Sequence, residues 1–118
     1  MPVPNPIVVE RVIEHPSGRE ELRHFYWCPG CDALHGIAVR PSKQNNGASW
    51  SFSGTLECPT YSPSQLTTWE TPTGKFRCHT FIRNGQIEFL SDCTHALKGK
   101  TVPLPPVPDW VMRETDEN

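Results

Sequence analysis

Two cysteines separated by a Pro-Gly dipeptide are the residues whose types and spacing most clearly predict chemistry. Cys28 and Cys31 enclose Pro29 and Gly30, and this tight turn can direct two sulfur atoms toward one ion. A closed zinc site needs four ligands, yet no second Cys-x-x-Cys pair follows at the spacing of a zinc ribbon. The pair therefore predicts half of a structural zinc site, whose remaining ligands come from other parts of the chain.

The remaining ligands are sought among the other cysteines and histidines. Cys78 is the best third ligand, because it lies on the inward face of the hairpin that the sequence predicts most strongly. His35, His79 and Cys93 are the candidates for the fourth position. Adjacent residues on a strand point to opposite faces, so Cys78 and His79 are not expected to reach the same ion. The favoured ligand set is Cys28, Cys31, Cys78 and His35. The alternative is that the first two cysteines are buried or redox-active thiols without a metal.

A serine and a histidine give the sequence its second chemistry. Ser64 lies in a proline-rich, turn-rich segment, and His79 is expected on the polar face of the predicted hairpin. A serine hydroxyl becomes a good nucleophile when a neighbouring imidazole takes its proton, and that imidazole needs a further group to fix its tautomer. Asp92 and His95 are the candidates for this group, with Glu57 as a weaker one. The alternative is that His79 is an ordinary surface histidine.

The element that must position these residues is a predicted hairpin over residues 75–90. Asn84-Gly85 is the strongest short signal for a two-residue hairpin turn, and it pairs position 83 with 86, 82 with 87, 81 with 88 and 80 with 89. Cross-strand partners share a face of the sheet. One face is therefore apolar and directed to the core, and it includes Cys78, whereas His79 lies on the other, more polar face.

Other segments predict the rest of the fold. Short apolar runs indicate strands at residues 7–13, 22–27, 34–39 and 50–53, whereas residues 58–64 contain two prolines and are expected to be loop or extended. Asp92 is expected to cap one helical turn over residues 94–98, closed by Gly99. The predicted fold class is mainly β, a small antiparallel sheet with hairpins and little helix around the zinc knuckle, with α+β as the alternative.

The domain organisation follows from length and from the proline-rich end of the chain. A chain of 118 residues has the size of one domain, so we expect a single zinc-stabilised domain over residues 1–118. Residues 103–118 are expected to form a C-terminal arm, polyproline-like over residues 102–110, laid over the domain and pinned by Trp110. The charged residues 113–118 are expected to be frayed.

Composition excludes several classes of protein. A net charge of −2 argues against a nucleic-acid-binding surface built on positive charge, and no apolar stretch reaches the length of a membrane span. The first six residues have neither a basic cluster nor an apolar run, so no secretory signal is expected. Five cysteines without a secretory signal do not suit a disulfide scaffold. These features predict a cytoplasmic protein whose thiols serve metal binding or catalysis.

Taken together, the motifs resemble a known family. The segments that carry the resemblance are Cys28-Pro-Gly-Cys31, His35, Pro59–Ser64, Cys78–Gly85 and Asp92–Gly99. Over about residues 25–110 the chain resembles a family of small phage and bacterial proteins, often misleadingly labelled ammonia monooxygenases. That family is similar to the peptidase component, BubE, of bacterial ubiquitination-like operons.

The resemblance implies a zinc-stabilised fold that carries a serine nucleophile and acts on ubiquitin-like C-terminal tails. Matched by position, Ser64 corresponds to the nucleophile and His79 to the base. Cys28 and Cys31 correspond to the metal site. If the chain is encoded by a phage, its location is the cytoplasm of the host.

The sequence supports three functional hypotheses. The first is a zinc-stabilised serine peptidase that uses Ser64 and His79, assisted by Asp92 or His95, to cleave a peptide or isopeptide bond. The second is a non-catalytic zinc-binding interaction protein of phage or bacterial origin that acts on a host defence component. The third is a thiol redox protein that uses the two cysteines of the knuckle. The partner of the first is a protein or peptide substrate, and no nucleic acid or membrane is expected as a partner of any of them.

Overall fold

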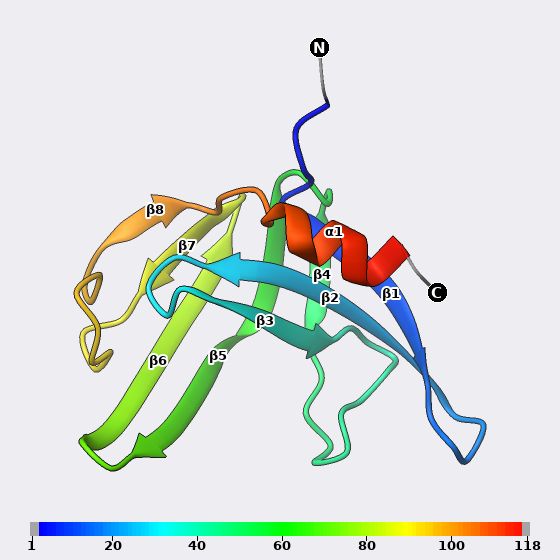
Figure 1. Ribbon diagram of the computed structural model, residues 1–118, viewed down its shortest axis with the longest axis horizontal. Helices are drawn as coiled ribbons and strands as arrows, with labels where there is room; N and C mark the ends of the chain where they lie inside the picture. Colours follow the sequence, from blue (N-terminus) through cyan, green and yellow to red (C-terminus); the bar gives the residue numbers. More distant parts are fainter. Residues whose placement is uncertain (1–2, 117–118) are drawn as a thin grey trace.

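The strands form two antiparallel sheets, as Figure 1 shows for the computed structural model, which describes residues 3–116. One sheet has three strands in the order β1-β2-β3, and the other has five in the order β4-β5-β6-β7-β8. The elements are β1 (Val8–Glu14), β2 (Glu20–Cys28), β3 (Ala33–Ala38), β4 (Ser51–Gly54), β5 (Pro59–Thr71), β6 (Gly74–Arg83), β7 (Gln86–Phe89), β8 (Thr101–Pro103) and α1 (Asp109–Asp116). The predicted mainly β fold with little helix is confirmed.

The three-stranded sheet carries the cysteine knuckle at one end. β1 pairs with β2, and β2 pairs with β3, so the strands predicted in this region are confirmed to within one or two residues at their ends. β2 ends at Cys28 and β3 begins at Ala33. The Cys28–Cys31 knuckle therefore forms the turn between two paired strands, and Asp32 completes that turn with a φ of 53°.

The hairpin of β6 and β7 has the predicted register. Positions 80, 81, 82 and 83 face positions 89, 88, 87 and 86. Asn84 and Gly85 between them have φ values of 51° and 76°, as a two-residue turn of the primed type requires. Cys78, Thr80 and Ile82 are buried, whereas the residues between them are only partly buried, so the predicted inward and outward faces of β6 are confirmed.

β5 agrees with the expected extended conformation in its first half and extends beyond it in its second half. Residues 58–64 were expected to be loop or extended, and most of them form the first half of the strand, whereas residues 65–71, for which we predicted no strand, form its second half. Pro59 fits because it is the first residue of the strand, and the pairing with β6 shifts register between Tyr61 and Gln65. A proline in a strand is tolerated where the ladder of hydrogen bonds is interrupted, and Pro63 lies within this interruption.

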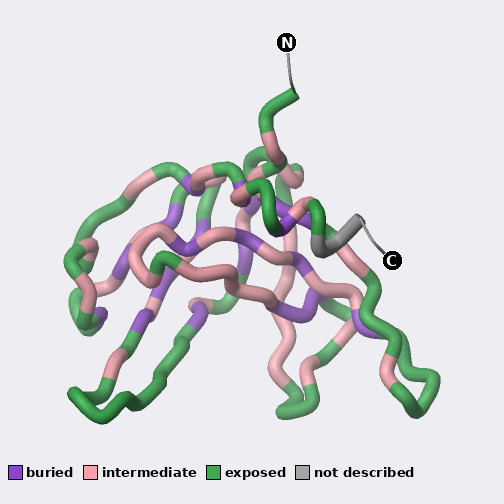
Figure 2. Tube along the Cα trace, viewed as in Figure 1, coloured by how far each residue is buried: buried purple, intermediate pink, exposed green. Residues whose placement is uncertain are grey.

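One apolar core joins the two sheets. Its buried side chains include Tyr26 and Ile37 from the three-stranded sheet and Ile82 and Phe89 from the five-stranded sheet. In Figure 2 the buried residues follow the middle of the molecule, whereas the tips of the β1–β2 and β5–β6 hairpins are exposed. Burial of these large side chains is the main source of stability that the chain itself provides.

A buried chain of hydrogen bonds also crosses between the sheets. His24 of β2 is fully buried, and its Nδ1 lies 2.6 Å from the Tyr61 hydroxyl of β5. Its Nε2 lies 2.7 Å from the Glu10 carboxylate of β1. Buried polar groups are stable only when they are paired in this way. Because Tyr61 is the last residue before the register shift in β5, the contact fixes one end of the irregular segment.

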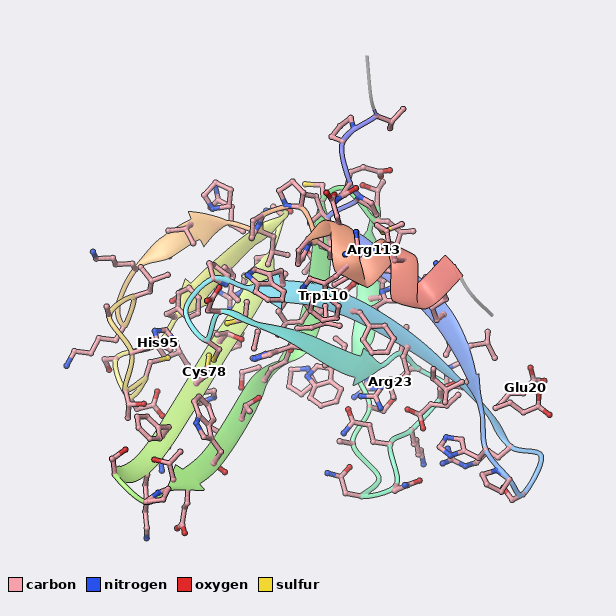
Figure 3. The ribbon with its side chains drawn as sticks, in the orientation of Figure 1. Glu20, Arg23, Cys78, His95, Trp110 and Arg113 are labelled. Carbon is pink, nitrogen blue, oxygen red and sulfur yellow. The ribbon has the colours of Figure 1, made fainter. Side chains whose placement is uncertain are left out.

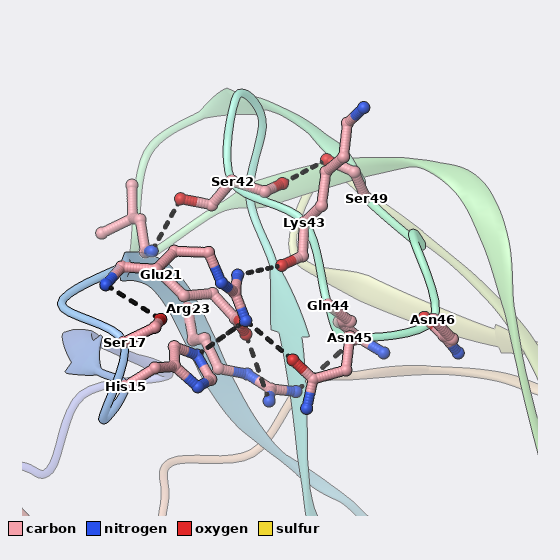
Figure 4. A network of polar contacts seen from close by, with 12 residues as sticks. His15, Ser17, Glu21, Arg23, Ser42, Lys43, Gln44, Asn45, Asn46 and Ser49 are labelled. Carbon is pink, nitrogen blue, oxygen red and sulfur yellow. Dashed lines mark hydrogen bonds and ion pairs between the residues drawn. The ribbon is translucent and has the colours of Figure 1, made fainter.

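A second polar network holds the loop that follows β3. Glu21 is 1% exposed, and its carboxylate contacts Arg19 and Arg23, each at 3.3 Å. Arg19 donates to the Lys43 carbonyl oxygen at 3.0 Å and to the Asn45 side chain at 2.7 Å, and Figure 4 shows Arg23 beside the same loop over residues 42–46. Arg23 donates to the Gly36 carbonyl oxygen at 2.7 Å and to the Gln44 side chain at 3.5 Å. The network therefore ties this loop to the outer strand β3.

The chain after β7 differs from the prediction in one place. Residues 94–98, expected as a helical turn, form turns without a helix, because the backbone bonds there join residues three apart, as in Lys98 N–H to the His95 carbonyl at 3.2 Å. Gly99 has a φ of 77°, as expected for the residue that ends such a segment. The prediction of a helix over residues 94–98 is therefore wrong.

The C-terminal arm lies against the three-stranded sheet. β8 pairs with β7, and after an irregular proline-rich stretch α1 lies across β1 and β2 in Figure 1. Val107 and Val111 are buried against Val9 of β1, whereas Trp110 contacts Trp27 edge-on but stays 43% exposed. The two valines, rather than the tryptophan, anchor the arm. Residues 113–116, expected to be frayed, belong to α1, and residues 117–118 lie outside the described residues.

Candidate active site and metal centre

Ser64, His79 and Asp92 form a continuous chain of hydrogen bonds. Ser64 Oγ lies 3.0 Å from His79 Nε2, and His79 Nδ1 lies 3.1 Å from Asp92 Oδ2. A carboxylate at Nδ1 favours the tautomer that carries its proton there, which leaves Nε2 able to accept the serine proton. The three side chains therefore have the order and spacing of a nucleophile, a base and a group that orients the base.

Strand alternation in β5 directs Ser64 to the outward face. Tyr61 pairs with Ile82 and Gln65 with Thr80, so four residues of β5 advance beside two of β6, and the extra residues make this segment irregular. Gln65 is buried, so Ser64 directly before it points to the outward face of the sheet, where His79 also lies. The Trp50 indole N–H donates to the Ser64 carbonyl oxygen at 3.3 Å and holds the backbone of the segment.

Asp92 reaches the histidine from the turn after β7. The Leu90 N–H donates to the His79 carbonyl oxygen at 2.9 Å, so the turn follows the edge of β6. Arg77 lies 3.6 Å from the Asp92 carboxylate. Desolvation raises the pKa of Asp92, but the hydrogen bond and charge of His79, together with Arg77, outweigh it, and the pKa lies below its usual value. The carboxyl group is therefore ionised at neutral pH.

Cys93 holds the backbone of the histidine from the other side. The His79 N–H donates to Cys93 Sγ at 3.2 Å, and the Cys93 thiol donates to the His79 carbonyl oxygen at 3.3 Å. Cys93 is 4% exposed. The residue pattern indicated this cysteine only as a candidate metal ligand, and no signal in the pattern connects it with the histidine backbone.

Three cysteines from two strands and the knuckle lie together. The sulfur atoms of Cys28, Cys31 and Cys78 are all within 4.8 Å of one another, and the first and third are 3.9 Å apart. Two thiolates on one tetrahedral zinc ion are separated by about 3.8 Å. Hydrogen bonds from Cys31 and Cys78 lower the pKa of Cys28 to about 2, and the same contacts with Cys28 raise the pKa of Cys78. Such crowded thiols, which cannot all ionise alone, fit a bound cation.

His95 lies beside this cluster, next to Cys78. Its Nε2 lies 3.4 Å from Cys78 Sγ, and a second group that could hold a metal consists of Cys78, Cys93 and His95. The ring rests on Gly30 of the knuckle, where an added Cβ would lie 2.2 Å from the imidazole. Figure 3 shows His95 beside Cys78. The Leu97 N–H donates to Nδ1 at 3.2 Å, and a metal at Nε2 would move the ring proton to Nδ1 and replace this contact.

The positions of two histidines differ from those we expected. His95, expected to assist the serine, lies beside Cys78 in a metal-compatible group with Cys93, whereas His35, the favoured fourth ligand, belongs to neither metal-compatible group of the described residues. His35 Nδ1 instead lies 3.3 Å from the Tyr26 hydroxyl. Burial lowers the pKa of His35, so this ring is neutral. The reason is geometric, because Gly30 leaves room for the His95 ring directly over the knuckle.

Glu57, the weaker candidate for orienting the histidine, lies elsewhere. Its carbonyl oxygen is close to Gly85, at the turn between β6 and β7, and it is exposed. The structure therefore brings together Ser64, His79 and Asp92 at one site, and separates them from the sulfur cluster by the thickness of the sheet.

Comparison with known families finds a match over most of the chain. A family model described as bacterial ubiquitination-like system serine protease (BubE) matches residues 6–90, which is more than half of the chain. The chain belongs to this family. The segment that matches the BubE family contains Ser64, His79 and the three clustered cysteines, and it ends two residues before Asp92. The comparisons with curated proteins and with solved structures gave no match. Among the described residues, no helix is both long and apolar enough to cross a bilayer.

Proposed function

We propose that this protein is a serine peptidase in which Ser64 is the nucleophile, His79 the general base and Asp92 the group that orients the base. The observation that carries the proposal is the unbroken series of contacts, 3.0 Å from Ser64 to His79 and 3.1 Å from His79 to Asp92. Membership of a family described as serine proteases supports it. The description of the family favours a ubiquitin-like protein as the substrate.

The proposed reaction proceeds through an ester on the serine. Ser64 Oγ attacks the carbonyl carbon of the scissile bond while its proton passes to His79 Nε2. When the tetrahedral intermediate collapses, the carbon–nitrogen bond breaks and His79 returns that proton to the leaving amine. A water molecule then attacks the ester with His79 again as base, which releases the acid and restores the serine. Asp92 stays ionised throughout and stabilises the imidazolium.

We further propose that the sulfur cluster holds a structural zinc ion. The ligands would be Cys28, Cys31 and Cys78 with His95, which replaces His35 in the set expected from the sequence. Four protein ligands leave no open position on zinc, so the bound ion would supply a cross-link between the knuckle, β6 and the turn after β7 rather than chemistry. A small core gains stability from such a cross-link.

An active-site probe tests the proposed peptidase. A fluorophosphonate reacts with a serine that a neighbouring base activates, and mass spectrometry of the labelled peptide locates the adduct. We expect one adduct per chain, on Ser64, that disappears in Ser64→Ala. Ser62→Ala is the matched control, because this exposed serine of the same strand lies two residues away, and it should label like the wild type. A folded, zinc-loaded wild type that does not react would instead favour the non-catalytic zinc-binding protein.

A further inference from the structure

The edge of β5 next to Ser64 lacks a strand partner among the described residues. β4 pairs with β5 only as far as Ser62, whereas β6 accompanies the other side of β5 from Gln65 to Thr71. The five-stranded sheet therefore has an internal strand that becomes an edge strand at the candidate nucleophile. Open strand edges attract other extended chains, and proteins normally cover or shorten them.

The hairpin geometry identifies which backbone groups this edge presents. The two-residue turn between β5 and β6 makes Thr71 and Gly74 a hydrogen-bonded pair, and such pairs alternate along an antiparallel ladder. Leu66, Thr68 and Glu70 consequently direct their N–H and C=O groups away from β6. The Ser64 carbonyl follows the same alternation, since it accepts from the Trp50 indole rather than from β6.

A groove of about 290 Å³ lies along this edge. It is lined on one side by residues 65–67 of β5 and on the other by residues 34–37 of β3, with Trp50 and Gln44 between them. β3 is itself the outer strand of its sheet. The groove thus separates two strand edges, and its lining on β5 begins at Gln65, the residue that follows Ser64. A space of this size fits a short extended peptide and is too small for a folded element.

The lining of the groove is held in place and contains a donor without a partner. Arg23 fixes both Gly36 and Gln44, so the wall opposite β5 belongs to the polar network of Figure 4. Gln65 is 5% exposed and accepts from the Tyr26 hydroxyl through Oε1, but its Nε2 has no partner among the described residues. A buried donor in this state is stabilised by any acceptor that reaches it. Leu66 adds an apolar side chain that is 57% exposed and lies opposite His79.

From these observations we infer that the substrate binds as an added β-strand along the open edge of β5, paired through its main chain with Leu66, Thr68 and Glu70. Main-chain pairing gives affinity without a requirement for particular side chains, and the peptide then passes over Ser64 with its scissile carbonyl. The inference rests on the proposed function, because it assigns the binding mode for the same site. The occupant of the open edge of β5 is an extended, unfolded peptide segment.

Two phosphonate probes test the inference. An alkyl fluorophosphonate needs only the reactive serine, whereas an alanine tripeptide bearing a C-terminal diphenyl phosphonate also needs the strand site. Thr68→Pro removes an outward N–H and is compatible with an edge position, and Thr68→Ala, which keeps that N–H, is the matched control. We expect Thr68→Pro to lower the peptide probe's rate about tenfold, through the lost hydrogen bond and the bulk of the ring, while the alkyl probe's rate is unchanged. Equal peptide-probe rates in Thr68→Pro and wild type would overturn the inference.

A second measurement is independent of catalysis. Ser64→Ala protein is titrated with millimolar acetyl-trialanine methylamide, and backbone amide shifts are followed by NMR. We expect changes at Leu66, Thr68 and Glu70 that exceed those at Thr67 and Trp69, which face β6. Absence of this alternation would overturn the strand site even if Ser64 reacts with the alkyl probe. Failure of the alkyl probe alone would overturn the proposed peptidase, and the NMR result would still decide the binding mode.

Discussion

Cys78 and His79 are neighbours in β6, yet their side chains leave opposite faces of the sheet. Cys78 Sγ lies 3.9 Å from Cys28 Sγ on the buried side, whereas His79 Nε2 lies 3.0 Å from Ser64 Oγ on the partly exposed side. Strand alternation requires this divergence. A single strand therefore connects a sulfur cluster suited to stability with a histidine placed for catalysis, and it directs the His79 imidazole away from the cluster of Cys28, Cys31 and Cys78.

Removal of the orienting carboxylate should slow the nucleophile. In Asp92→Asn the amide can donate to Nδ1, which favours the tautomer with its proton on Nε2, where it faces the serine. We expect the rate of fluorophosphonate labelling to fall on the order of 10²- to 10⁴-fold. Circular dichroism should show the wild-type fold, and Asp109→Asn in α1 serves as a control. An unchanged rate in Asp92→Asn would exclude the carboxylate from the mechanism.

The same carboxylate should contribute stability that depends on pH. Because the pKa of Asp92 is lower in the folded state, its contribution is present above the unfolded value of about 3.9 and is lost as the pH falls through the folded value. The difference in free energy of unfolding between wild type and Asp92→Asn should therefore shrink below pH 4. Urea denaturation at several pH values measures this difference. A difference that grows as the pH falls below 4 would contradict the assignment.

Metal content should show whether His95 or His35 is the fourth zinc ligand. We expect one zinc ion per chain in the wild type, and much weaker retention against a chelator in His95→Ala, because a closed site loses one of four ligands. His35→Ala should retain zinc as the wild type does. Elemental analysis after dialysis against EDTA provides the measurement. The opposite result, with zinc lost only in His35→Ala, would restore the ligand set expected from the sequence.

Gly30 should be required for the proposed zinc site. A Cβ at this position would lie 2.2 Å from the His95 ring, a separation that forces the imidazole to move. Gly30→Ala should therefore lower zinc retention as well as the thermal midpoint. Gly18→Ala is a useful comparison, since that position has a φ of 89° and open space. It should cost about 1 kcal/mol of stability through backbone strain alone and leave zinc retention unchanged.

The contact between the two sheets should support the irregular part of β5. Tyr61→Phe removes the hydroxyl that lies 2.6 Å from His24 Nδ1 and leaves a fully buried nitrogen without that partner. We expect a loss of about 1–3 kcal/mol in the free energy of unfolding, measured in urea. Tyr26→Phe also removes a buried hydroxyl, but that hydroxyl is bonded to Gln65. The rate of fluorophosphonate labelling in Tyr26→Phe should therefore lie closer to the wild-type rate than the rate in Tyr61→Phe does. Equal stability of Tyr61→Phe and wild type would show that the contact contributes nothing.

The sequence was most informative where chemistry is local. The Asn84-Gly85 turn fixed the register of β6 and β7, because only residues that tolerate positive φ fit a primed two-residue turn. From that register the divergence of Cys78 and His79 follows directly. The Pro-Gly knuckle likewise indicated which two sulfur atoms lie together.

The sequence was least informative where long-range packing decides. The second half of β5 is a strand because β6 returns along it, although its exposed threonines and Glu70 gave no apolar alternation that we could recognise. The choice between His35 and His95 depends on which ring lies over Gly30, a contact between residues 65 positions apart that no local pattern encodes. The register shift beside Ser64, between Tyr61 and Gln65, belongs to the same class.

The central claim is that Ser64 is a nucleophile activated by His79, while the metal-compatible cluster lies on the other side of the sheet. A crystal structure of fluorophosphonate-treated, zinc-loaded protein, with anomalous data at the zinc edge, measures both parts at once. We predict a phosphoryl group on Ser64 Oγ beside His79, and an anomalous peak among Cys28, Cys31, Cys78 and His95. An anomalous peak on His79, or an unmodified Ser64, would contradict the claim.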